Sequence, residues 1–312
     1  MMQVEQGFIP ALSLRTTTRN GKLPEGFEAA TADGCCLAIE SEHSLPEFFV
    51  SEEQLRERLM RELTLVHGIG PEREQMCRRR GIQTLADLRR TNWKPEAQEI
   101  AEIMQNGTPR EVIRLFREKG RGADPLLIGF GAAVPKEDLL FFDIETLGMV
   151  HSPIILFGCG VCEGRTLRVT QYLLRDIGEE IAALGLVAEM MRTHPDLVTY
   201  NGRSFDLPFT NNRLAYYGER ECRPALHFDL LHTSRRLFRE DLPDCCLGTV
   251  EEYVLGCGRE EDLPGYLVPV YYQKYLHTGD PAPLKQIVDH NRSDVTSLAL
   301  LLARQTEIVY GT

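Results

Sequence analysis

The feature that most constrains the fold is an apolar run that leads straight into two carboxylates. In the segment LLFFDIET, residues 139–146, Asp143 and Glu145 follow four apolar side chains. The pattern predicts a buried strand, on which side chains two residues apart point to the same face. Two carboxylates on one face inside an apolar run repel each other, which costs free energy unless a cation lies between them. We therefore predict a divalent metal site on this strand.

Two later motifs each add a carboxylate. Asp206 lies in TYNGRSFDLPF, residues 199–209, and Asp294 lies in DHNRSDVTSLALL, residues 289–301. Asp206 suits a helix N-cap, whereas Asp294 lies inside a predicted helix, where aspartate is a weak helix former and needs another reason. Carboxylate oxygens are preferred by hard cations, and four of them together suit two-metal phosphodiester cleavage. We expect two Mg²⁺ or Mn²⁺ ions to be held by Asp143, Glu145, Asp206 and Asp294.

These motifs, in this order, resemble those of the DEDD (DnaQ-like) 3′–5′ exonuclease superfamily, which has a ribonuclease H-like fold. The strings HFDLLHTSRRLF, CCLGTVEEYVLG and REEDLPGYLVPVYY narrow the resemblance to the YprB-like ribonuclease H-like family, over roughly residues 138–308. The resemblance implies a metal-dependent 3′–5′ exonuclease that acts on the 3′ end of DNA or RNA. It also implies that the matching acid, Asp206, reaches the second metal.

His290 lies four residues before Asp294, so both side chains point along one helix face. Histidine is a competent general base near neutral pH, and we expect His290 to activate the attacking water. The alternative is a structural histidine that bonds to a carboxylate. In the resembling superfamily one branch has tyrosine at this spacing and another has histidine one residue earlier. This departure keeps open a nuclease-derived nucleic-acid-binding module that is catalytically weak or inactive.

The turn before Asp206 holds two further candidates for nucleic-acid binding, Asn201 and Gly202. We expect a strand-to-helix turn here, where glycine would let the substrate approach the backbone. Asp229 is a candidate for ordering this turn. Arg235 and Arg236 are candidates for gripping a phosphate.

A glycine turn earlier in the chain indicates a second nucleic-acid contact. A predicted helix ends at Gly68-Ile69-Gly70, and Pro71 suits the first position of the next helix. The segment resembles the helix-hairpin-helix element, whose turn offers backbone N–H groups to one DNA phosphate. The same element also occurs as a purely structural packing unit. A structure-specific endonuclease is a further alternative that fits this turn.

The charge distribution is uneven along the chain. The 312 residues carry a net charge of −11, but residues 61–124 hold 13 Lys/Arg and 10 Asp/Glu, a net of +3.

Nine cysteines at irregular spacing predict reduced thiols, with a metal or redox site at Cys159 and Cys162 as the alternative. No run is long and apolar enough to span a membrane, and the first residues lack a secretory pattern, so we expect a cytoplasmic protein with no membrane partner.

The order of the predicted elements indicates an α/β fold class. We expect a ribonuclease H-like mixed β-sheet flanked by helices and preceded by a small, mainly helical domain. Residues 1–50 are predicted as an extension with weak β character, and residues 51–135 as the helical domain, closed by a Gly- and Pro-rich linker, GRGADPLLIGFGAAVPKED. Residues 136–312 are predicted as the ribonuclease H-like exonuclease domain.

Overall fold

A seven-stranded mixed sheet lies at the centre of the computed structural model, which describes residues 22–47, 50–149, 152–259 and 263–311. The strand order is β1-β2-β5-β4-β3-β6-β7. The strands are β1 (Phe27–Thr31), β2 (Gly34–Ser44), β3 (Leu139–Thr146), β4 (Ile154–Glu163), β5 (Thr166–Leu173), β6 (Asp196–Thr199) and β7 (Leu226–Asp229). The predicted α/β class with a mixed sheet is confirmed.

Strand directions decide where the polar residues gather. Strands β3, β4 and β5 form an antiparallel meander, while β6 runs parallel to β3 and β7 runs parallel to β6. The carboxyl ends of β3, β6 and β7 therefore meet at one edge of the sheet. Glu145 lies near the end of β3, and the segments after Thr199 and Asp229 follow β6 and β7 at the same edge.

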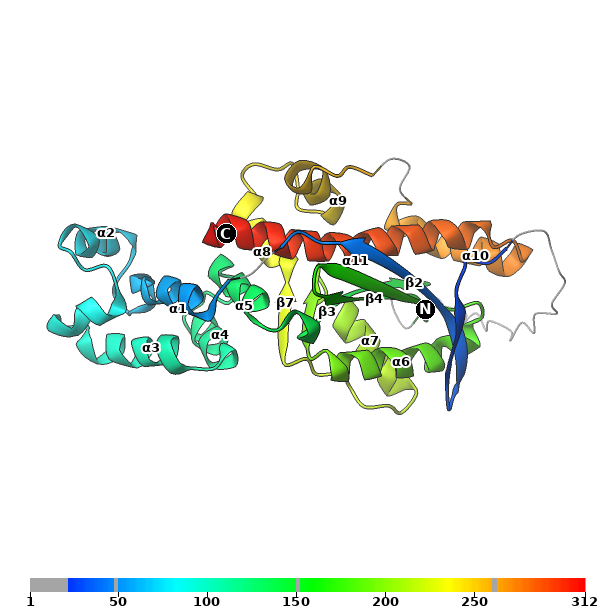
Figure 1. Ribbon diagram of the computed structural model, residues 1–312, viewed down its shortest axis with the longest axis horizontal. Coiled ribbons are helices and arrows are strands. Elements are labelled where there is room, and N and C mark those ends of the chain that lie inside the picture. Colours follow the sequence, from blue (N-terminus) through cyan, green and yellow to red (C-terminus); the bar gives the residue numbers. More distant parts are fainter. Residues whose placement is uncertain (1–21, 48–49, 150–151, 260–262, 312) are drawn as a thin grey trace, which may run out of the picture.

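Helices cover both faces of the sheet (Figure 1). The long helix α11 (Ala282–Tyr310) lies on one face, and α6 (Glu180–Thr193) and α7 (Asp206–Tyr216) lie on the other. Glycines in β4 allow α11 to approach closely, because a Cβ added to Gly158 would lie 2.7 Å from the Val295 side chain. The close approach places the polar residues of α11 directly over the carboxylates of β3.

The predicted β character near the N-terminus belongs to the central sheet. Strands β1 and β2 form a hairpin, and β2 pairs along its length with β5, from Leu37 opposite Leu173 to Ser44 opposite Thr166. The hairpin thus extends the same sheet as the acidic strand. The rest of the predicted extension, residues 1–21 and 48–49, lies outside the described residues.

The mainly helical segment between β2 and β3 forms one end of the molecule (Figure 1). It contains α1 (Glu52–Met60), α2 (Pro71–Arg79), α3 (Lys94–Asn106) and α4 (Pro109–Glu118). The prediction that a helix runs up to the glycine turn at Gly68 is wrong. Helix α1 ends at Met60, and a 3-10 turn at Leu63–Leu65 follows. Leu63 and Leu65 are both fully buried, and an α-helix would turn two such residues about 200° apart.

The predicted linker is also wrong. Residues 128–133 form a helix, α5, whose residues Ile128 to Ala132 are buried. A Cβ added to Gly129 would lie 2.5 Å from the ring of Tyr310 on α11, so its glycines serve close helix packing. The buried side chains join the helical segment and the sheet domain in one continuous core.

The remaining helices surround α11. They are α8 (Leu230–Phe238), α9 (Leu247–Val250), a π-helical segment (Glu251–Leu255) and α10 (Val268–Thr278). The π-helical segment ends at Gly256, which has a left-handed φ of 69° that suits glycine. All nine cysteines are free thiols, including buried Cys159 and Cys162 on β4. No helix in the described part of the chain is long and apolar enough to cross a membrane.

Candidate active site

Four carboxylates converge from three elements at one edge of the sheet. Strand β3 contributes Asp143 and Glu145, and the buried Ile144 between them faces the other way. Asp206 begins α7, and its carboxylate accepts a hydrogen bond of 3.1 Å from the backbone N–H of Ile144, which ties α7 to β3. Asp294 comes from α11, on the opposite face of the sheet from α7.

Two of these carboxylates, those of Asp143 and Asp206, lie where burial and neighbouring acids disfavour the charged form. The pKa of Asp143 lies well above its usual range because the group is desolvated, and because Asp294, Asp206 and Glu145 are close. Burial also raises the pKa of Asp206 to about 7, although two backbone hydrogen bonds lower it. An all-carboxylate set with excess negative charge fits a hard divalent cation such as Mg²⁺ or Mn²⁺.

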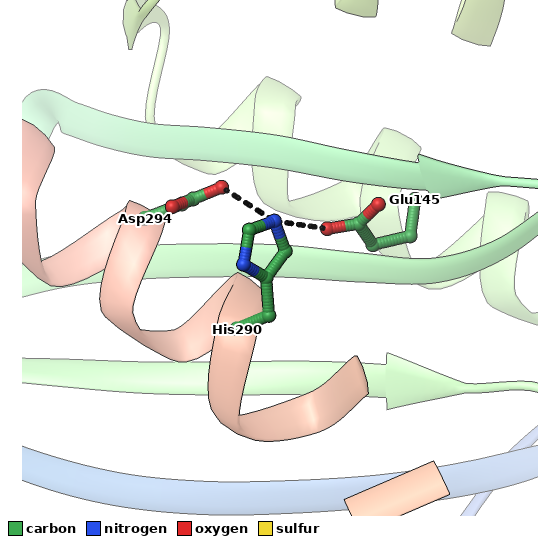
Figure 2. Close-up of side chains that lie close together, drawn as sticks. All are labelled: Glu145, His290 and Asp294. Carbon is green, nitrogen blue, oxygen red and sulfur yellow. Dashed lines mark ion pairs between the residues drawn. The ribbon is translucent and has the colours of Figure 1, made fainter. Parts of the chain in front are cut away.

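His290 lies within the acidic cluster (Figure 2). Its Nε2 is 3.6 Å from Glu145 Oε1 and 3.6 Å from Asp294 Oδ2. Ligand atoms of Glu145, His290 and Asp294 all lie within 4.8 Å of one another. The predicted pairing of His290 and Asp294 on one helix face is confirmed, and the imidazole is near enough to the carboxylates to exchange a proton or to share a metal.

Sequence reasoning missed a cation in this cluster, Arg259. Its guanidinium forms ion pairs with Asp294 and with Glu251, and Nη1 lies 3.3 Å from His290 Nδ1. Glu251 is 1% exposed and lies in the π-helical segment, an irregularity that occurs often at functional sites. The acidic and basic residues in "VEEYVLGCGRE" lie far from the acidic motifs in sequence, so only the fold reveals this contact.

A buried amide pair positions Asp143, and it was also missed. Asn291 Nδ2 donates to Asp143 Oδ2 at 2.8 Å, and Gln171 Nε2 donates to Asn291 Oδ1 at 2.8 Å. Asn291 and Gln171 are both fully buried, Asn291 on α11 and Gln171 on β5. Strand β5, TLRVTQYL, mixes polar and apolar residues, so no sequence pattern singles out Gln171; only its burial in the fold shows that the amide needs a partner.

The turn before α7 is ordered as proposed for Asp229. The Asp229 carboxylate accepts hydrogen bonds from the backbone N–H groups of Asn201 at 2.8 Å and Arg203 at 3.0 Å. Asn201 is exposed and has a positive φ of 65°. Gly202 is buried, and an added Cβ would lie 2.5 Å from Thr199 Cβ, so packing within the chain already requires this glycine.

The remaining candidates do not join the acidic cluster. Gly68, Ile69 and Gly70 precede α2, which lies at the far end of the molecule from the sheet (Figure 1). Gly68 and Gly70 are exposed and Ile69 is buried. Arg235 lines two surface pockets beside α8, and Arg236 lines one of them.

Comparison with known proteins agrees with this architecture. A family model described as "RNase_H superfamily" matches residues 140–305, which include Asp143, Glu145, Asp206 and Asp294. The chain therefore belongs to the RNase H superfamily. It is 37% identical over 199 residues to "Uncharacterized protein YprB" of Bacillus subtilis (strain 168), covering 61% of this chain and 46% of that protein.

The chain thus spans about half the length of that relative. Among solved structures, a family B DNA polymerase from the hyperthermophilic archaeon Pyrobaculum calidifontis is 19% identical, with a TM-score of 0.45. The match covers 55% of this chain and 25% of the polymerase.

The raised pKa of Asp206 predicts a pH-dependent stability without metal. Folded protein holds a proton here up to about pH 7, whereas the unfolded chain releases it near pH 4, so this contribution is lost as pH rises through 7. In the presence of chelator, the melting temperature of Asp206→Asn minus that of wild type should therefore increase from about pH 5 to 8. Excess Mn²⁺ should reduce or reverse that difference. A difference that stays flat with pH in chelator would contradict the assignment.

Arg259→Ala should destabilise the metal-free protein by roughly 3 kcal/mol, because it leaves Asp294 and buried Glu251 without their shared cation. Urea unfolding in chelator measures this loss, and Mn²⁺ should recover part of it. Arg304→Ala is the matched control, since the Arg304–Glu307 pair is about half exposed and should contribute less than about 1 kcal/mol. Equal losses of unfolding free energy in the two variants would show that the ion pairs of Arg259 contribute no more than an exposed pair does.

Proposed function

We propose that this chain is a metal-dependent nuclease of the DEDD type that removes nucleotides from the 3′ end of a nucleic acid. The observation that carries the proposal is the convergence of Asp143, Glu145, Asp206 and Asp294 with His290 at one sheet edge. Membership of the RNase H superfamily supports the same chemistry, because the matched residues contain every one of these side chains. The substrate phosphodiester would lie over the carboxyl end of β3.

Each residue has a definite task in this proposal. Asp143, Glu145 and Asp294 would hold Mg²⁺ or Mn²⁺, and Asp206 would complete the shell of a second ion. The bound ions would stabilise the negative charge that develops on the phosphate. His290 would accept a proton from the attacking water through Nε2, the nitrogen that faces the carboxylates.

Residues outside the acid set would keep this geometry fixed. The hydrogen bond from Asn291 orients the Asp143 carboxylate, and Gln171 holds the Asn291 amide in turn. Arg259 pairs with the Asp294 carboxylate and would orient it. Such supporting contacts matter because loss of a partner that orients a metal ligand commonly reduces affinity or activity 10- to 100-fold.

A direct test uses end-labelled single- and double-stranded DNA and RNA, incubated with Mg²⁺, with Mn²⁺ or with chelator. We expect a ladder that shortens stepwise from the 3′ end and that depends on the metal. Discrete internal cuts would instead indicate a structure-specific endonuclease. Binding without cleavage on every substrate would indicate a nuclease-derived binding module.

We also propose that the Gly68–Gly70 turn contacts a phosphate as a helix-hairpin-helix element. Gly70 is the sharper probe, because nothing lies within 4 Å of an added Cβ and its φ of −86° suits any residue. Gly70→Leu should weaken binding of long nucleic acids but leave cleavage of short oligonucleotides unchanged. Gly68 has a φ of 82°, so substitution there would strain the backbone and confuse the result. If folded Gly70→Leu binds long nucleic acids with unchanged affinity, the turn has only a structural packing role.

A further inference from the structure

A groove rich in arginine lies between α4 and the start of the edge strand β7. Its volume is about 690 Å³. Four arginines and one histidine line it, and none of its described lining residues is acidic. They are Arg110, Arg114, Arg117, Arg203 and His227. On a chain with a net charge of −11, such a concentration of one sign needs an explanation.

Helix α4 presents three of these arginines in a row. Arg110, Arg114 and Arg117 are spaced i, i+4 and i+7, which places them on one face over roughly 10 Å. The other face is held in the core by buried side chains, so the row cannot rotate away from the groove. The buried side chains are those of Val112, Leu115 and Phe116. The Arg110 Nε also donates to the Ala225 carbonyl at 2.9 Å, which anchors α4 against β7.

Two of the arginines in the groove, Arg114 and Arg203, are weakly compensated by acids within the chain. The ion pair that Arg114 forms with Glu118 spans 3.9 Å between side chains that are about two-thirds exposed, so it contributes little. Arg203 is half-buried, and its pKa is lowered by burial and then by Arg117. Asp229 is the acid near Arg203, but its carboxylate already accepts three backbone hydrogen bonds. An added anion would therefore offset repulsion among these cations.

The position of Arg203 connects the groove to the acidic cluster. Arg203 lies in the turn between β6 and α7, three residues before Asp206. Its guanidinium donates to the His227 carbonyl on β7, whereas the Asp206 carboxylate accepts from Ile144 on β3. Strand β6 lies between β3 and β7. The turn after β6 therefore places the Asp206 carboxylate in the candidate active site and the Arg203 guanidinium in the groove.

We infer that this groove binds the sugar–phosphate backbone of the nucleic acid strand that continues away from the candidate active site. The inference rests on the proposed nuclease function and extends it to the path of the substrate. Guanidinium groups suit phosphate oxygens because they donate in a planar fork. The contacts would go to the backbone, so binding in the groove would be independent of base sequence.

The test measures binding without cleavage. Fluorescence anisotropy in chelator gives the affinity of a long single-stranded DNA, a long single-stranded RNA and a short oligonucleotide for the full chain at several salt concentrations. The variant Arg114→Ala/Arg117→Ala removes two exposed arginines from the groove. Arg165→Ala/Arg304→Ala removes the same charge from positions that do not line it.

We expect the groove variant to bind the long strands roughly tenfold more weakly than wild type. The slope of log affinity against log salt should fall by about 1.4, the value for two lost phosphate contacts on a single strand. Cleavage of the short oligonucleotide with Mn²⁺ should persist, as should the melting temperature. The control variant should match wild type in binding.

Two results would overturn the inference. One is a groove variant that is folded and keeps both the wild-type affinity and the wild-type salt slope. The other is an equal loss in the control variant, which would reduce the effect to net charge. Failure of the nuclease proposal is separate, because it appears as absent cleavage with Mn²⁺ while salt-dependent binding in the groove remains measurable in chelator.

Discussion

Asp143→Asn should reduce phosphodiester hydrolysis by roughly 10²-fold or more, since metal ions contribute several kcal/mol to the transition state and 1.36 kcal/mol corresponds to a factor of ten. The substitution keeps the shape of the side chain and removes one charge from the cluster. Asparagine can still meet the Asn291 amide, so the local packing should survive.

The same variant should show an opposite effect on stability. Asp143 is desolvated and repelled by Asp294, Asp206 and Glu145, so its neutral replacement should raise the melting temperature in chelator. The rise in melting temperature that Mn²⁺ produces in wild type should shrink. Lower activity with higher metal-free stability would distinguish a metal ligand from a residue needed only for folding.

Asp289→Asn is a suitable control for this experiment. Asp289 is on α11 next to His290, but its side chain is 48% exposed and pairs with Arg292 on the surface. This variant should keep both the activity and the response to Mn²⁺. Full activity in Asp143→Asn, or a rise in melting temperature with Mn²⁺ equal to that of wild type, would show that Asp143 does not ligate the metal.

His290→Ala should cost about 10²–10⁴ in turnover if His290 is the general base. His290→Tyr should retain more activity than the alanine variant, because one branch of the resembling superfamily has tyrosine at this spacing. The comparison should be made at saturating Mn²⁺, so that a change in metal affinity does not hide a change in turnover.

Metal affinity separates two roles that the geometry allows for His290. Its Nε2 lies close enough to Glu145 and Asp294 for all three to share an ion. A general base leaves the affinity for Mn²⁺ nearly unchanged when it is removed, whereas a ligand weakens it. Wild-type turnover in both the alanine and the tyrosine variants would show that the histidine only bonds to the carboxylates.

Local patterns in the sequence predicted most elements of the sheet domain, because each pattern depends on residues that are neighbours along the chain. The apolar run before Asp143 predicted β3, and the structure has a strand there at Leu139–Thr146. Local patterns also indicated the acids of the candidate site. A carboxylate in a buried strand or inside a helix costs free energy, so its presence there needs a reason.

Contacts between distant segments were decided by the tertiary structure alone. The glycines of α5 resemble a linker in the sequence, but in the fold Gly129 packs against Tyr310 and Gly131 against Leu302, both on α11, because glycine favours both flexible turns and close packing. Arg259 reaches Asp294 across 35 residues of sequence, and Gln171 reaches Asn291 across 120. No local period encodes such contacts, since they arise only when α11 packs on the sheet. The sequence by itself therefore determined which residues could ligate a metal, and the packing of α11 decided which residues hold them in place.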